Sequence, residues 1–458
     1  MHAPSLAVRS EPRQRWFLLG LCVFFLAINV VYVLKIAHSE RSESRSAFQR
    51  WRMQILELGE GENIWAKHVY PNPPIMALVL MPLMQLPPFI GALAWFYLKV
   101  VMAVLALHWV LSLLDVSERP FPWWGKLLAV LLCLRPIEGD LVHGNVNLFI
   151  LFLVVAGLVA FCAKRDWLAG LTLGLAIACK ITPALFLPYF LWKRAWTALA
   201  ATLLGTAIFT WIVPGMFLGW RDNYGYVLKW YDNMVQPYAD GKITSEAVNQ
   251  SLPGYAYRML THNPSFITFV KDEQGIFRFT PVEYHNLVTL DEKAVQWLVK
   301  GCMGLFALFV IWRCRTPLSD RHSWHLMAEF SVVILGMLLF SERTWKHHCV
   351  TLLLPFAVIA YRLSALPTTP RLRCYLIGTL AAAFTLMTLT TTGLSARLDR
   401  FGDLAQVYGA YVWAFLLLLA AMLLLARPFR PGYDANSIPE PAGGSRNVHG
   451  HPDHAPVT

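Results

Sequence analysis

The sequence predicts an all-α, polytopic membrane protein with about 11 to 13 transmembrane helices and interfacial helices in its first outer loop. Its composition is the first indication, because 56% of the residues are hydrophobic and only 15% are charged. A soluble protein has about 25% charged residues. The second indication is that long apolar runs recur along the chain and short basic segments separate them.

The apolar runs supply the candidate spans, which lie at 16–36, 89–114, 123–134, 148–162, 168–179, 183–192, 195–213, 295–312, 326–340, 350–361, 375–394 and 407–425. Because a helix needs about 20 residues to cross a hydrocarbon core of roughly 30 Å, several runs must recruit neighbouring residues. The shorter run 75–86 ends at Pro87 and Pro88. We expect it to lie near the outer interface, because counting it as a span would reverse the side of the next basic loop.

Lys and Arg gather in short loops on one predicted side of the membrane, at 9–15, 119–126, 164–165, 193–194, 313–321, 371–373 and 427–430. The positive-inside rule assigns this side to the cytoplasm of a cell (inner) membrane, with both termini inside. Residues 1–15, 16–430 and 431–458 are then a cytoplasmic N-terminus, a transmembrane domain and a disordered tail. The outer segments are 38–88 and 219–295, and the chemistry is expected on that outer face.

The net charge of +11 does not indicate nucleic-acid binding. The basic residues flank apolar runs, as orientation in a bilayer requires. The eight cysteines lie in or beside apolar segments without paired or metal-ligand spacing, and we interpret them as small core residues.

A polar segment at 135–147 separates two apolar runs on the outer side and carries Asp140, His143, Asn145 and Asn147. These side chains fit acid–base chemistry or the binding of a polar substrate, and the glycines of the segment let a ligand approach the backbone. The alternative interpretation is a polar hairpin in which Asn145 or Asn147 caps a helix.

A second outer cluster lies at 341–348 and contains the candidate ligand-binding residues Arg343, Trp345, Lys346, His347 and His348. Its cations suit a phosphate group, and its Trp ring suits a sugar ring or a prenyl chain. The alternative is that the cations snorkel to the interface and the Trp belongs to the aromatic belt.

Several ionisable residues lie in or beside the spans, where a charged side chain either snorkels or finds an opposite charge. Lys180 follows an apolar run near the outer end of its hairpin and is a candidate for binding an anion. Lys99 and Lys300 are interpreted as structural or snorkelling residues. Glu329 is expected to pair with a neighbouring helix.

The long outer segment adds three further candidates for substrate binding, Asn249, Gln250 and Arg258. Carboxamides bind hydroxyl groups and a guanidinium binds phosphate. We expect this segment to be ordered, because aromatic residues recur along it.

The chain resembles family 87 glycosyltransferases of the GT-C superfold, multi-pass enzymes that use polyprenyl-phosphate sugars and include mannosyltransferases and arabinofuranosyltransferases. The resemblance covers about 70–355 and implies a GT-C-like helix bundle. It rests on motifs in the family order, namely Tyr70-Pro71-Asn72-Pro73-Pro74, Met81-Pro82-Leu83, Gly144-Asn145-Val146-Asn147-Leu148, Gly170 through Lys180 to Pro183, Asn249-Gln250-Ser251-Leu252, and Ser341 through Trp345 to His347-His348 with Leu354-Pro355.

The resemblance implies inverting transfer of a glycosyl residue, such as mannosyl, from a polyprenyl-phosphate donor to a hydroxyl of a glycolipid or glycan at the outer face. This reaction needs a carboxylate base and cations for the leaving phosphate. The family's catalytic aspartate falls near Ser46 or Ala47, which are not acidic. Glu43 is therefore the favoured base and Asp140 the second candidate, while Arg52 is expected to help hold phosphate.

The sequence leaves open whether a divalent metal ion is a cofactor. Glu138 and Asp140 offer oxygen ligands for such an ion. Arg and His side chains are an equally suitable means of neutralising the phosphate.

A transporter or flippase of a lipid-linked saccharide is the alternative function, because it shares the many spans and the basic inner loops. Transporters have paired repeats with polar residues at the bilayer midplane. This sequence has no repeated half, and its polar clusters lie at one predicted face, so an enzyme is favoured.

Overall fold

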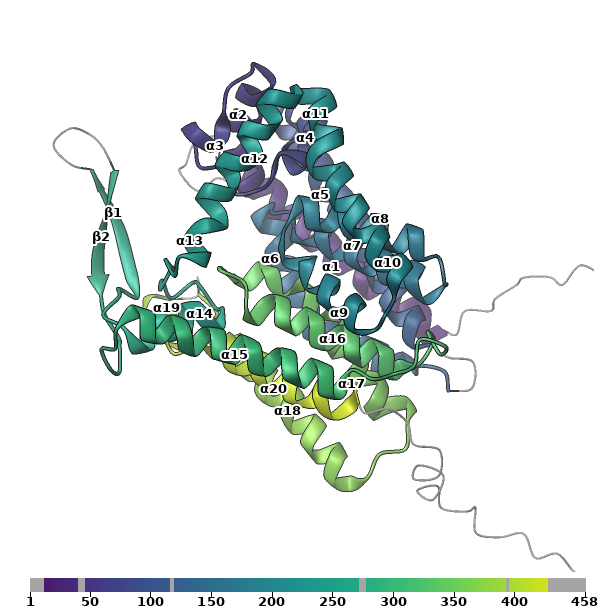
Figure 1. Cartoon of the computed structure of the whole chain (residues 1–458). Coiled ribbons are helices and arrows are strands. Elements are labelled where there is room, and N and C mark those ends of the chain that lie inside the picture. Colours follow the sequence, from purple (N-terminus) through teal and green to yellow (C-terminus); the bar gives the residue numbers. More distant parts are fainter. Residues whose placement is uncertain (1–11, 40–45, 116–118, 272–276, 393–394, 427–458) are drawn as a thin grey trace, which may run out of the picture.

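Helices form the body of the computed structural model, which describes residues 12–39, 46–115, 119–271, 277–392 and 395–426 (Figure 1). Those of the first half are α1 (Pro12–Ser39), α2 (Ala47–Gly59), α3 (Ile64–Lys67), α4 (Pro74–Met84), α5 (Pro88–Leu114), α6 (Trp123–His143), α7 (Asn147–Cys162), α8 (Asp166–Cys179), α9 (Phe186–Trp192), α10 (Trp196–Ala207) and α11 (Val213–Leu218). Those of the second half are α12 (Trp220–Met234), α13 (Gln236–Ala239), α14 (Leu252–Leu260), α15 (Glu292–Arg313), α16 (Trp324–Leu339), α17 (Leu353–Ala365), α18 (Pro370–Leu389), α19 (Ala396–Val407) and α20 (Ala410–Leu425). Short 3-10 helices, η1 (Thr182–Leu185) and η3 (Lys346–Leu352), and a π-helical turn, η2 (Ile208–Ile212), complete the helical part.

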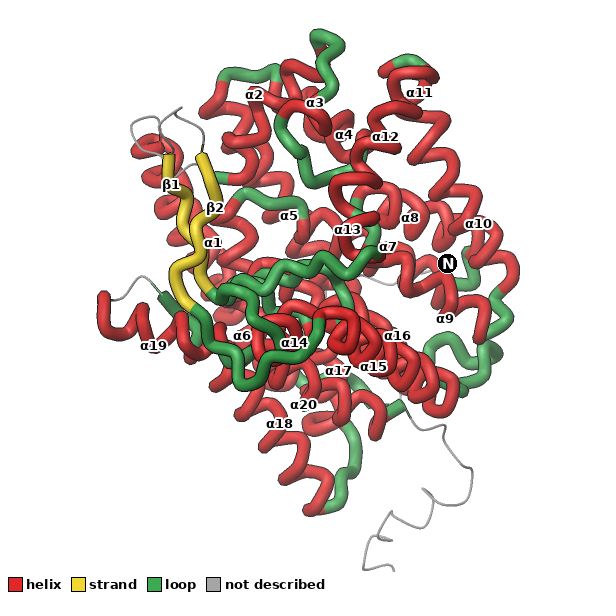
Figure 2. The backbone as a smooth tube through the Cα atoms, turned by 60° about the vertical axis from the view of Figure 1, so that its left-hand side comes forward, coloured by secondary structure: helices red, strands yellow, loops and turns green. Residues whose placement is uncertain are grey.

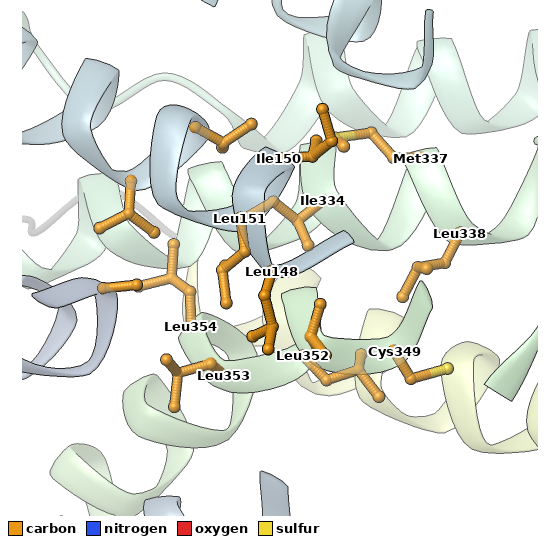
Figure 3. Packing of buried hydrophobic residues seen from close by; sticks show 14 of the residues in the cluster. Leu148, Ile150, Leu151, Ile334, Met337, Leu338, Cys349, Leu352, Leu353 and Leu354 are labelled. Atoms are coloured by element: carbon orange, nitrogen blue, oxygen red, sulfur yellow. The ribbon is translucent and has the colours of Figure 1, made fainter. Parts of the chain in front are cut away.

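The helices α5 to α8, α16 and α17 form the interior of the bundle. Every residue of α16 from Leu326 to Leu339 is buried, as expected for a helix with apolar residues on all sides, and Glu329 and Ser331 are buried among them. Figure 3 shows Leu148 and Ile150 of α7 within one cluster with Ile334 and Met337 of α16. These apolar contacts fix the positions of the polar residues at the helix ends.

The prediction of an all-α polytopic membrane protein is confirmed. Among the described residues, five helices are long and apolar enough to cross a membrane, and six if the bent pair α19–α20 is one span. The predicted count of about 11 to 13 is not reached by length alone. Helices such as α7, with 16 residues, and α8, with 14, are shorter than the roughly 20 residues that a complete crossing needs.

The polar segment predicted as a link between two runs is largely helical, because α6 continues from Trp123 to His143. The interpretation of 135–147 as a hairpin is therefore wrong for most of its length. The helix ends at Gly144, whose φ of +72° lies in the left-handed region that glycine favours. Asp140 and His143 consequently lie on the last turns of a long helix, which fixes their directions.

Polar candidates and basic loops lie at opposite ends of the interior helices. Asn147 begins α7 and Lys180 follows α8, whereas the basic link at 164–165 joins the other ends of the two helices. A rise of about 1.5 Å per residue separates the two ends of α7 by roughly 24 Å. The polar candidates are thus grouped away from the basic loops.

Side-chain bonds connect the basic loops to one another. Arg321 forms an ion pair with Asp166, and Lys193 Nζ donates a hydrogen bond to the Thr316 carbonyl. The links at 164–165, 193–194 and 313–321 therefore meet at one end of the bundle.

Glu329 of α16 is fully buried close to these loops. Its carboxylate accepts hydrogen bonds from Lys193 Nζ at 2.9 Å, from the Tyr189 hydroxyl at 2.8 Å and from the Thr316 N–H at 2.6 Å. The prediction that Glu329 pairs with a neighbouring helix is confirmed, since Tyr189 belongs to α9.

One β-hairpin departs from the all-α pattern. The strands β1 (Phe266–Lys271) and β2 (Phe277–Glu283) pair antiparallel, with Thr268 opposite Thr280. Figure 1 shows the hairpin standing away from the bundle, and both Figure 1 and Figure 2 show its base next to α19. An ion pair of 2.8 Å between Arg400 of α19 and Glu283 fixes this base. The described residues of the outer segment 219–295 form helices and strands, in line with the expected order, but the strands were not predicted.

Candidate active site

Three polar side chains from separate elements meet at the end of the interior that lies away from the basic loops. Lys180 follows α8, Asn147 begins α7, and His348 belongs to η3. Lys180 Nζ lies 3.3 Å from His348 Nε2 and donates a hydrogen bond to Asn147 Oδ1. An ammonium group beside an imidazole is suited to binding an anionic ligand.

A pocket opens beside this cluster, lined by Asn147, Ile150, Lys180, Thr182, Met337, Leu338, Ser341, Thr344, His348 and Thr351. One part of the lining is cationic and hydroxylated. The other part is apolar, and Figure 3 shows that its residues Ile150, Met337 and Leu338 belong to the buried hydrophobic cluster. This combination suits a ligand that joins an anionic group to an apolar one.

A buried ion pair lies directly behind the pocket. Asp140 of α6 and Lys99 of α5 are both fully buried, and Lys99 Nζ lies 3.5 Å from Asp140 Oδ2. Asp140 Oδ1 accepts a hydrogen bond of 3.0 Å from Asn147 Nδ2, and Asp140 Oδ2 accepts one of 3.3 Å from the Leu148 N–H. The sequence interpretation of Lys99 as structural or snorkelling missed this specific partner.

A second group of side chains borders the cluster. The rings of His143 and His347 stack at 4.6 Å, and Asn145 Nδ2 lies 3.1 Å from His347 Nε2. The Trp345 ring meets His347 edge-on at 5.4 Å. The structure therefore brings together candidates from the segments 135–147 and 341–348.

Ser46 occupies the place where the resemblance puts an acidic residue. The fold brings it to the turn at Gly144, which follows α6. It is buried and caps α2, accepting a hydrogen bond from the Gln49 N–H. A Cβ added at Gly144 would lie 3.2 Å from Ser46 Cβ, so the two residues are in close contact. Glu43, the favoured base, lies outside the described residues.

Three predicted phosphate-binding cations point to other partners. Arg343 is exposed, with Nε 3.0 Å from both Glu342 Oε1 and Thr244 Oγ1. Lys346 Nζ donates to the Thr390 carbonyl. Arg52 Nη2 donates to the Leu86 carbonyl at 3.2 Å.

Glu342 and Arg343 form an ion pair at the start of the segment 341–348. Burial raises the pKa of Glu342, and the neighbouring Arg343 guanidinium opposes this rise. Thr244 of the outer segment bonds both residues, because its hydroxyl donates to the Glu342 carboxylate and accepts a hydrogen bond from Arg343 Nε.

A family model matches the part of the chain that contains Asp140, Asn147 and Lys180. The model of glycosyltransferase family 87 matches residues 70–341, which is more than half of the chain. The chain belongs to glycosyltransferase family 87. The predictions of the family and of a membrane glycosyltransferase are confirmed.

Curated proteins with related sequences include mannosyltransferases and an arabinofuranosyltransferase. A polyprenol-phosphate-mannose-dependent alpha-(1-2)-phosphatidylinositol mannoside mannosyltransferase of Mycobacterium tuberculosis (strain ATCC 25618 / H37Rv) is 28% identical over 286 residues, which are 59% of this chain and 62% of that protein. The enzyme of the same description from Mycolicibacterium smegmatis is 27% identical over 390 residues, 81% of this chain and 79% of that protein. An alpha-(1->3)-arabinofuranosyltransferase of Corynebacterium glutamicum is 27% identical over 269 residues, 56% of this chain and 60% of that protein. The chain thus spans less than two thirds of the first and third of these relatives.

The candidates from the long outer segment of this family 87 protein are bonded to backbone. Arg258 is fully buried, and its guanidinium donates to the carbonyls of Val407, Ser245, Glu246, Asn249 and Gln406. Asn249 Nδ2 donates to the carbonyls of Thr244 and Glu342, and Gln250 Nε2 donates to those of Ala247 and Gln406. These bonds join the outer segment to the 341–348 cluster and to α19.

We expect the substitution Arg258→Met to destabilise the protein without weakening donor binding. It leaves several buried carbonyls without a donor, so the free energy of unfolding should fall by roughly 3 kcal/mol or more. Thermal unfolding in detergent measures the change, with Arg400→Met as the control, because Arg400 belongs to an exposed ion pair whose loss should change stability little. A normal unfolding temperature together with a higher KM for donor would instead identify Arg258 as a substrate-binding residue.

Metal binding has little support from the described residues, in which no three His, Cys, Asp or Glu side chains are grouped to hold an ion. The two carboxylates considered as ligands have other partners. Glu138 forms an ion pair with Arg135, and Asp140 pairs with Lys99.

Proposed function

We propose that the protein transfers a glycosyl residue, a hexosyl group such as mannosyl, from a polyprenyl-phosphate donor to a hydroxyl of a glycolipid or glycan. The observation that carries the proposal is the pocket in which Lys180 and His348 lie beside an apolar wall. A polyprenyl-phosphate sugar has the matching chemistry, since a phosphate joins its sugar to a hydrocarbon chain. The named mannosyltransferases similar to this chain depend on such a donor.

In the proposed reaction the acceptor oxygen forms a bond with C1 of the sugar as the bond between C1 and the phosphate oxygen breaks. The phosphate leaves with the bonding electrons, and attack from the opposite face inverts C1. Lys180 and His348 stabilise the charge that grows on the phosphate. His143, Asn145 and His347 border the cluster and are the proposed contacts of the sugar.

Of the two predicted bases, we propose Glu43 for accepting the acceptor proton. It precedes Ser46 by three residues in the sequence. Ser46 contacts Gly144 beside His143 and Asn145. Asp140 is less suited because it is fully buried and both of its carboxylate oxygens have partners.

We propose that the site faces the outer side of the cell (inner) membrane and that both termini are cytoplasmic. The basic loops at 164–165, 193–194 and 313–321 meet at the end of the bundle opposite Lys180. Positive loops favour the cytoplasmic side. A membrane-impermeant thiol reagent applied to intact cells should therefore label a cysteine introduced at exposed Arg343, and not one introduced at exposed Arg194.

The experiment that tests the function uses purified protein in vesicles with radiolabelled polyprenyl-phosphate mannose and a panel of glycolipid acceptors. We expect label to move to an acceptor in a time-dependent reaction. Movement of intact sugar-lipid across the vesicle membrane, without any transfer, would support the alternative of a transporter or flippase.

A further inference from the structure

The carboxylate of Asp140 is closed off from the pocket by its own partners. It is fully buried, Oδ1 is bonded to Asn147 Nδ2, and Oδ2 is bonded to the Leu148 N–H. A general base must come within about 2.6 to 3.2 Å of the group whose proton it takes. Any contribution of Asp140 to the reaction therefore passes through its neighbours.

Lys99 fixes Asp140 from the other side. Its Nζ donates to the Asp140 carbonyl at 2.6 Å and lies 3.4 Å from the Leu141 carbonyl, so it caps the last turn of α6. The same ammonium neutralises the buried carboxylate. Because the Leu148 N–H belongs to the first turn of α7, this one ion pair joins the end of α6 to the start of α7.

The carboxamide of Asn147 has a defined orientation between two charges. An ionised carboxylate only accepts hydrogen bonds, and an ammonium only donates them. Only one amide orientation satisfies both groups, with Nδ2 toward Asp140 and Oδ1 toward Lys180. The position of the Lys180 ammonium beside His348 thus depends on the charge of Asp140.

We infer that Asp140 is a positioning residue, which through Asn147 sets the place of the Lys180 ammonium in the pocket. The inference rests on the proposed function, in which Lys180 binds the donor phosphate. It assigns the chain of Lys99, Asp140, Asn147 and Lys180 to phosphate recognition and removes Asp140 from the candidates for base.

The test is a charge exchange between positions 140 and 147. In Asp140→Asn the new amide places a donor against Lys99, the Leu148 N–H or Asn147, so KM for polyprenyl-phosphate mannose should rise roughly ten-fold, with a smaller fall in kcat. In the double variant Asp140→Asn with Asn147→Asp, every donor again faces an acceptor. The new amide at 140 accepts from Lys99 and the Leu148 N–H and donates to the new carboxylate at 147, which accepts from Lys180. We expect its KM to return to within about three-fold of the unsubstituted protein.

Two further variants keep the test decisive if Asp140→Asn folds poorly. Asn147→Ala leaves Asp140 intact and should raise KM in the same way. Glu329→Gln is the matched control, because Glu329 is an equally buried carboxylate bonded to a lysine at the other end of the bundle. It should lower the unfolding temperature and leave KM unchanged.

The outcomes separate the inference from the proposed function. Loss of kcat in both Asp140→Asn and the double variant, with normal kinetics in Asn147→Ala, would identify Asp140 as the base and overturn the inference alone. Equal KM values in all folded variants would also overturn it. If the unsubstituted protein neither binds polyprenyl phosphate nor transfers sugar from its mannosyl derivative, the proposed function fails and the inference fails with it.

Discussion

Glu43→Gln is expected to lower kcat by about 10² to 10⁴, the usual contribution of a general base, with little change in donor KM. The substitution removes the proton acceptor and keeps the size of the side chain. Transfer of label from polyprenyl-phosphate mannose under saturating donor and acceptor measures the effect. The thermal unfolding temperature should stay the same, since Glu and Gln side chains have nearly the same size and shape.

Glu40→Gln is the matched control, because Glu40 is the other carboxylate of the same short segment and is three residues further from Ser46 in the sequence. It should retain nearly full activity. Full activity in Glu43→Gln would remove Glu43 from the reaction. Loss of activity in Glu40→Gln alone would move the base to that position.

Lys180→Met should reduce kcat/KM for the donor by about 10² to 10³, as is typical when one donor to a developing oxyanion is removed. The ammonium is the positive group that the pocket holds between Asn147 and His348. Its loss weakens both the binding of the phosphate and the stabilisation of its charge as it leaves. Steady-state kinetics with polyprenyl-phosphate mannose measure the change.

Lys300→Met provides the control, since Lys300 is also a lysine of an apolar helix and its Nζ lies over the Trp297 ring at 5.0 Å. We expect unchanged kinetics in that variant. A loss of similar size in both variants would point to a general effect of charge on the protein in the membrane, and not to phosphate binding by Lys180.

The sequence predicted the class of fold and the segments that form the candidate site. Apolar runs and basic loops indicated a polytopic membrane protein, and Asn147, Lys180 and His348 were each selected from separate segments. Their convergence depends on packing between α7, α8 and η3, which no local pattern records.

Other features depended on partners far along the chain. The role of Lys99 required knowing that Asp140 lies beside it, 41 residues later. The available signal was physical, because a lysine in an apolar helix needs an anion or a route to water. In the sequence, in contrast, Arg258 cannot be told from an arginine that binds phosphate. Only its hydrogen bonds to five backbone carbonyls indicate a structural role.

The most direct measurement is an experimental structure of the protein with a non-hydrolysable phosphonate analogue of polyprenyl-phosphate mannose. We predict that the phosphonate lies within hydrogen-bond distance of Lys180 Nζ and His348, with the prenyl chain along Ile150, Met337 and Leu338. A phosphonate bound elsewhere, with the Lys180 ammonium still held by Asn147 alone, would contradict the account.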